Sequence, residues 1–271
     1  MTWPAEGTDG KVLSLMAVDP ETGDWSTVID GCERGARISR DGRSVAFVRD
    51  RGLWVAGLPG VGVEPPRRVA ELESTSGSPP VWSNDGRRLL ISQGKHGEGE
   101  DSRWEFATIG VGIDGRDRAA IDLPVEDGVQ DATADGSRLL VATSRNAAIG
   151  WQLDVTGPDG RKPVRVTEGG NPFYARFAPD GRSLLYTDGT TEARRGIWVV
   201  AADGSNRRRV LPQSPHVSAC FAPDGLRIAA WAWDREATGI RSRLLIAGLD
   251  GVITRTIHLP SNAAGDMPDW R

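Results

Sequence analysis

The chain has 271 residues, of which 38% are hydrophobic and 26% charged, a balance that allows a buried core and excludes a disordered chain. The formal net charge of −4 excludes the strongly basic surface that is typical of nucleic-acid binding. We therefore expect no nucleic-acid partner. No run of about 18 apolar residues occurs, so we also expect no membrane insertion.

The first elements in chain order are two strands within residues 11–29, joined by a turn. Five copies of a repeat follow, and each contains an Asp-Gly pair after a short apolar run. The aspartates of these pairs are spaced 44 to 50 residues apart and are Asp41, Asp85, Asp135, Asp180 and Asp224. The chain ends on MPDWR, which aligns Trp270 with Trp82 at the opening of the second repeat.

Each repeat has the pattern of four short antiparallel strands. The first strand ends in Asp-Gly, whose glycine tolerates the positive φ of a tight hairpin turn. An apolar second strand follows, such as SVAFV or SLLYT, and then a third such as GIWVVAA and a fourth such as RRRVLP. We expect the tryptophans of the third strands to share one register: Trp54, Trp104, Trp151 and Trp198.

Four strands per repeat of roughly 45 residues predict the blades of a β-propeller, an all-β fold in which neighbouring blades cover each other's faces. We predict six blades in one domain covering residues 1–271. The complete repeats are expected at about 32–76, 77–126, 127–170, 171–213 and 214–260. Residues 1–31 and 261–271 are expected to share the sixth blade, so that N- and C-terminal strands close the ring.

The best copy of the repeat reads FAPDGRSLLYTDG…GIWVVAADGSNRRRV over residues 177–210 and resembles the TolB-type WD-like repeat. The resemblance covers about residues 11–271 and implies a six-bladed, often bacterial and extracytoplasmic propeller. No counterpart of the separate N-terminal domain of TolB is visible in this sequence. The segment MTWPAEGTDGK lacks the basic and apolar regions of a signal peptide, which leaves the compartment open.

Candidate ligand-binding residues lie where a fourth strand connects to the next first strand, because these connections rim the funnel of a propeller. The polar residues singled out there are Arg37, Gln130, Asp131, Tyr174, Arg176, His216 and Asp266. Convergent polar groups around a pocket indicate a binding site. The alternative is that they satisfy main-chain groups along a water-filled channel.

The histidines and cysteines of the sequence give little support for a metal site or a reactive thiol. His96, His216 and His258 belong to different parts of the ring, so we predict no shared metal site and no cofactor. Cys32 and Cys220 fall on blades that are not neighbours, so we expect two free thiols rather than a disulfide.

The leading hypothesis is therefore a non-enzymatic binding or scaffold propeller. It would recognise a protein, a peptide or a small ligand at the funnel face of the central channel, as a monomer. The alternative is a small enzyme of the lyase, hydrolase or cyclase type with its active site in the same funnel. That alternative is kept because Asp131, Tyr174, Arg176 and His216 are expected on one rim, and because the related oligogalacturonate lyase is catalytic in its propeller funnel. The Gly-x-Ser-x-Gly motif of the hydrolase domain in prolyl oligopeptidases, another related family, is absent here.

Overall fold

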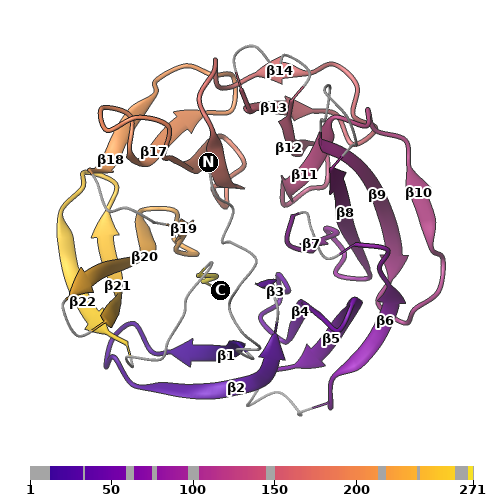
Figure 1. Ribbon diagram of the computed structural model, residues 1–271, viewed down its shortest axis with the longest axis horizontal. Coiled ribbons are helices and arrows are strands. Elements are labelled where there is room, and N and C mark those ends of the chain that lie inside the picture. The colour runs from indigo at the N-terminus through magenta and orange to yellow at the C-terminus, as the bar shows by residue number, and fades with distance from the viewer. Residues whose placement is uncertain are drawn as a thin grey trace.

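The computed structural model describes residues 13–32, 34–58, 64–74, 78–96, 104–144, 150–212, 218–236, 239–259 and 268–270. Its strands form a ring of antiparallel sheets around a central axis, the arrangement of a β-propeller (Figure 1). Five sheets have four strands each, and a sixth sheet of two strands stands between the first and the last of them. The all-β propeller prediction is thus confirmed.

The five four-stranded blades follow one another along the chain. Blade 1 contains β3 (Arg34–Ile38), β4 (Ser44–Arg49), β5 (Gly52–Gly57) and β6 (Arg67–Glu71); blade 2 contains β7 (Val81–Trp82), β8 (Arg88–His96), β9 (Trp104–Gly112) and β10 (Ala119–Ile121). Blade 3 contains β11 (Asp127–Ala132), β12 (Leu139–Thr143), β13 (Gln152–Thr156) and β14 (Val164–Arg165). Blade 4 contains β15 (Pro172–Phe177), β16 (Ser183–Asp188), β17 (Gly196–Ala201) and β18 (Arg208–Pro212). Blade 5 contains β19 (Ser218–Phe221), β20 (Arg227–Glu236), β21 (Gly239–Gly248) and β22 (Ile253–His258).

Within each blade the first strand lies nearest the axis and the fourth lies on the outside (Figure 1). The second strands are buried on both faces, as their unbroken apolar runs predict; all five residues of β12 are buried. Each pair of neighbouring blades shares one apolar cluster. Leu53 and Leu89 belong to the cluster between blades 1 and 2, and Ile197 and Ile228 to the one between blades 4 and 5. The core is therefore a ring of interfaces between blades rather than a single centre.

The Asp-Gly pairs form the turns between first and second strands. Their glycines all have positive φ, between 67° and 71°: Gly42, Gly86, Gly136, Gly181 and Gly225. In each turn the aspartate accepts a hydrogen bond from the main-chain N–H two residues ahead, as Asp41 does from Arg43 at 3.1 Å. Hydrogen bonds from the hydroxyls of Ser39, Ser83 and Thr133, followed by these main-chain bonds, favour the ionised form and lower the pKa of Asp41, Asp85 and Asp135.

The sixth sheet consists of β1 (Leu13–Val18) and β2 (Trp25–Cys32), in the places that a third and fourth strand would take (Figure 1). Residues 268–270 lie on its inner side, near the axis. Trp270 packs against the buried cluster of Cys220, Ala229 and Ile246 in blade 5. Segments from both ends of the chain therefore meet between blades 5 and 1. Residues 1–12, part of the segment predicted to share this blade, lie outside the described residues.

The predicted register of the four tryptophans is wrong for two of them. Trp54 pairs with Phe47, and Trp198 pairs with Tyr186 at the equivalent position of its repeat. An arginine guanidinium lies over each of these two indoles. In blade 2 the matching pair is Ile91 and Ile109, whereas Trp104 pairs with His96 at the end of the hairpin. In blade 3 Asp154 holds the matching position and Trp151 precedes the strand.

In blade 2 the physical reason is the length of the hairpin. Strands β8 and β9 run for nine residues each, so the tryptophan of blade 2 is carried beyond the matching position.

Among the described residues, no helix is long and apolar enough to cross a membrane.

Candidate functional site

One residue from each first strand holds the same place in the ring. Counted from the Asp-Gly aspartate, it lies four residues earlier, and it pairs with the residue five positions after that aspartate. The C-terminal alignment of Trp270 with Trp82 puts Asp269 at this place in the sixth blade. We call these six residues the inner ring: Arg37, Val81, Asp131, Arg176, Cys220 and Asp269.

The charged members of the inner ring in blades 1, 3 and 4 follow an irregularity in their strands. The pairing register shifts between Arg34 and Arg37, between Val129 and Asp131, and between Phe173 and Arg176. Strand β19, which carries uncharged Cys220, pairs with β20 without a shift. A bulge redirects the side chain that follows it, and bulges are common beside functional sites.

The next residue of each first strand faces the other way, into the core between blades. Trp82, Ala132, Phe177 and Phe221 belong to four different apolar clusters. Side chains alternate between the two faces of a strand. The four charged inner-ring residues belong to none of these clusters, whereas Val81 and Cys220 each belong to an apolar cluster. The four charged residues and Cys220 line one cavity.

The two carboxylates of the inner ring each accept a main-chain hydrogen bond from the next blade in the ring. Asp269 accepts from the N–H of Ile38 in blade 1 at 2.7 Å. Asp131 accepts from Ala132 and from Phe177 in blade 4, both at 2.9 Å. Asp269 also accepts from Arg176 Nη1 at 2.5 Å, and both side chains of this ion pair are 6 to 7% exposed. The carboxylates thus join separate blades near the axis.

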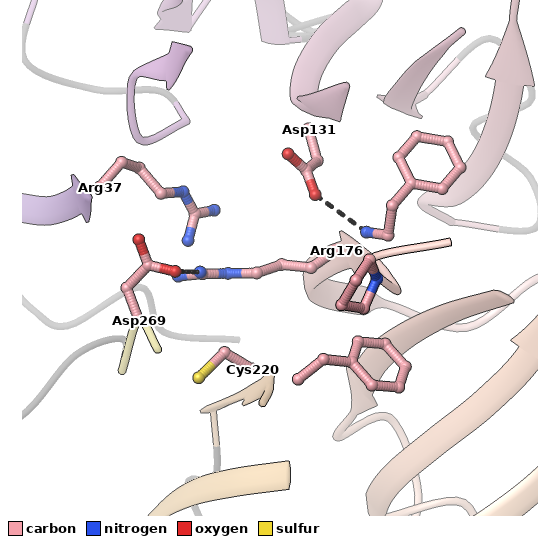
Figure 2. Close-up of a pocket in the computed structure, with 8 residues that line it drawn as sticks. Arg37, Asp131, Arg176, Cys220 and Asp269 are labelled. Carbon is pink, nitrogen blue, oxygen red and sulfur yellow. Dashed lines mark hydrogen bonds and ion pairs between the residues drawn. The ribbon is translucent and has the colours of Figure 1, made fainter. Parts of the chain in front are cut away.

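The two arginines of the inner ring lie side by side, with the Arg37 guanidinium turned toward that of Arg176 and toward Asp269 (Figure 2). Each residue is 5% exposed. Three buried nitrogens, Arg37 Nη1 and Arg176 Nε and Nη2, have no hydrogen-bond partner among the described residues. These unsatisfied donors are the most unusual feature of the site, because buried polar groups are nearly always paired.

A cavity of about 30 Å³ is lined by five inner-ring residues together with Phe177, Pro179 and Phe221. The last three follow the inner ring along the chain, toward the Asp-Gly turns. The cavity is large enough for about two water-sized groups. It is therefore a small, charged pocket with an apolar wall.

The sequence prediction brought together three residues that the structure places in this pocket: Arg37, Asp131 and Arg176. Gln130 adjoins it and donates to Ser78 Oγ at 2.6 Å, which connects blade 3 to the start of blade 2. Tyr174 lies two residues before Arg176, half-buried and with a positive φ of 54°. His216 and Asp266 lie outside the described residues, so their assignment stays a prediction.

Sequence reasoning missed Asp269 and Cys220 as members of the site. The signal for Asp269 was present, because the alignment of Trp270 with Trp82 fixes its register. Counting the same position in every repeat would have found both. The segment 262–269 was instead represented by Asp266.

Metal-binding and thiol groups are sparse in the described part of the chain. No group of three or more His, Cys, Asp or Glu residues there is arranged to hold a metal ion. His258 ends the outer strand β22 and is exposed. Cys32 and Cys220 are both buried and free of a disulfide, as predicted. Burial raises the pKa of the Cys32 thiol to about 11, so it is a poor nucleophile at neutral pH.

Comparison with known proteins identifies the architecture. No family model and no curated protein matches the sequence. Among solved structures, putative TolB from Agrobacterium tumefaciens matches with a TM-score of 0.73 and 18% identity, covering 96% of this chain and 95% of that one. TolB from Acinetobacter baumannii matches with a TM-score of 0.71 and 16% identity, covering 92% of this chain and 60% of that one.

A chain in the crystal structure of a nidogen/laminin complex matches with a TM-score of 0.64 and 11% identity, covering 92% of this chain and 91% of that one. At these identities the matches show a fold similar to the TolB propellers, which the sequence resemblance anticipated. They leave the function to be argued from the site itself.

Proposed function

We propose that this propeller is a non-enzymatic binding protein whose central channel recognises a protein, a peptide or a small ligand. The observation that carries the proposal is the convergence of charged side chains from four blades on one cavity near the axis. Burying these charges is costly, and a site with unsatisfied donors is poised to bind a polar group of a ligand. The similarity to TolB and nidogen/laminin structures supports a binding role by analogy of fold.

The arrangement favours binding over proton transfer. A general base must have a lone pair within hydrogen-bond reach of the proton that it removes. Both carboxylates of the inner ring instead accept main-chain N–H groups that join blades. Moving either carboxylate toward a substrate would break these bonds, so we assign the inner ring to recognition.

A peptide-display selection on the immobilised protein tests the proposal. Gln130→Ala and Tyr174→Ala remove two polar side chains beside the inner ring and leave its charges unchanged. We expect peptides enriched on the native protein to bind at least one of these variants about tenfold more weakly, with a melting temperature within a few degrees. Arg161→Ala, an exposed arginine that pairs with Asp159 at 3.7 Å, serves as the matched control.

Equal binding of every enriched peptide to all three variants would place recognition elsewhere on the molecule. A selection that enriches no peptide would contradict peptide or protein recognition at the channel. The first result would overturn the proposal, and the second would restrict it to a small ligand.

A further inference from the structure

We infer that the inner ring binds a carboxylate group, held by Arg176 and Arg37. The inference rests on the proposed function, because it names the chemistry that a ligand presents to the channel. The carboxylate can belong to a small organic acid, an acidic side chain or the end of a peptide. All three present the same two oxygens to the site.

Arg176 supplies the main binding edge. Its Nη1 is taken by Asp269, whereas Nε and Nη2 are buried and have no partner in the described part of the chain. The N–H bonds of Nε and Nη2 lie on one edge of the guanidinium plane and point the same way. This fork matches the two oxygens of a carboxylate and gives two parallel hydrogen bonds.

Arg37 supplies a third donor and a second positive charge. Its guanidinium lies beside that of Arg176, and its buried Nη1 has no partner among the described residues (Figure 2). Asp269, the acid nearest to it in Figure 2, is instead paired with Arg176. An arginine in a protein does not lose its proton, so this buried charge stays and favours an anion.

The acids already present leave these donors unsatisfied. Asp131 is held by the N–H groups of Ala132 and Phe177, and Asp269 by the N–H of Ile38 and by Arg176. Turning either carboxylate toward Arg37 would leave a main-chain N–H group without its hydrogen-bond acceptor. A further anion therefore completes the hydrogen bonding without disturbing the contacts between blades.

The cavity limits the size of this anion. About 30 Å³ accommodates two water-sized groups, which suits the two oxygens of a carboxylate better than the four of a phosphate or sulfate. Phe177, Pro179 and Phe221 form the apolar part of the wall. They can contact the carbon atoms that carry the carboxylate.

The test replaces sodium chloride by sodium acetate at constant ionic strength and measures the melting temperature and calorimetric binding of the intact protein. We expect a saturable rise in melting temperature with acetate and none with acetamide, the neutral analogue of the same shape. Arg37→Met removes the unpaired charge and should weaken acetate binding about tenfold or more. Without acetate, this variant should be at least as stable as the native protein, because it no longer buries an unpaired charge.

Arg176→Lys keeps the charge and removes the fork, so it should also lose most of the acetate affinity. Arg161→Met, a change at an exposed site, should bind acetate as the native protein does. Equal effects of acetate and acetamide, an unsaturable response, or unchanged binding by Arg37→Met would overturn the inference. A chloride affinity equal to that of acetate would also overturn it, because a halide does not use the fork.

The two proposals fail separately. If selected peptides depend on Gln130 or Tyr174 while acetate does not bind, the channel is a recognition site and the carboxylate inference is wrong. If acetate binds and no peptide is enriched, the inner ring is an anion site and peptide recognition is wrong.

Discussion

The ion pair between Arg176 and Asp269 makes a sharp prediction about how the ring is closed. Asp269 belongs to the last residues of the chain, yet it accepts hydrogen bonds from Ile38 of blade 1 and from Arg176 of blade 4. Both side chains of the ion pair are at most 7% exposed. Asp269→Ala leaves the guanidinium of Arg176 buried without its counter-ion and leaves the Ile38 N–H without an acceptor.

Breaking a buried ion pair by removing one partner costs about 3–5 kcal/mol. For a chain of this size, each kcal/mol corresponds to about 2–4 °C in melting temperature, so Asp269→Ala should melt roughly 10 °C lower. Asp269→Asn, which retains an acceptor for Ile38, should fall between this variant and the native protein. Chemical denaturation and calorimetry measure both changes.

The surface pair of Lys95 and Glu105, 3.3 Å apart, provides the control, because Glu105→Ala should cost no more than about 1 kcal/mol. The double variant Arg176→Met with Asp269→Ala should recover part of the loss, since no buried charge remains unpaired. An Asp269→Ala variant as stable as the native protein would refute closure by this ion pair. A strictly additive double variant would refute the coupling.

Three further predictions concern turns and titration. Gly42→Ala should cost about 1 kcal/mol in chemical denaturation, because φ is 71° there and no atom lies near the added methyl group; an unchanged stability would show that the turn relaxes. Hydrogen bonds lower the pKa of Asp135 in the folded state, so its contribution to stability is present above the unfolded pKa of about 3.9 and is lost as the pH falls. Asp135→Asn should therefore reduce the loss of stability in acid. A variant with the same dependence of stability on pH as the native protein would contradict this. The Cys32 pKa of about 11 lies above the unfolded value, so stability should fall as the pH rises from about 9 to 11, and a Cys32→Ser variant that shows the same fall would contradict it.

Much of the fold could be predicted from sequence because the repeat reports it many times. Five Asp-Gly pairs at nearly one spacing fix five turns, and the structure gives each glycine the positive φ that such turns require. The buried second strands follow from their apolar runs. A single landmark per repeat was less reliable: the tryptophan register failed where the hairpin of β8 and β9 is longer.

The candidate site was only partly predictable. The topology puts Arg37, Asp131 and Arg176 near the axis, and the sequence analysis found them. Which carboxylate pairs with which arginine depends on side-chain directions after the bulges, and these depend on the packing of whole blades. Asp269 was within reach through its register, whereas the unsatisfied donors of Arg37 and Arg176 appear only once burial is known.

The Nε–H resonance of Arg176 in a ¹H–¹⁵N spectrum during an acetate titration tests carboxylate binding by the inner ring most directly. We predict a saturable shift of this resonance with slower hydrogen exchange in the native protein, and a much weaker response in Arg37→Met. A resonance that acetate leaves unmoved, or that shifts only as much as those of exposed arginines, would contradict the account.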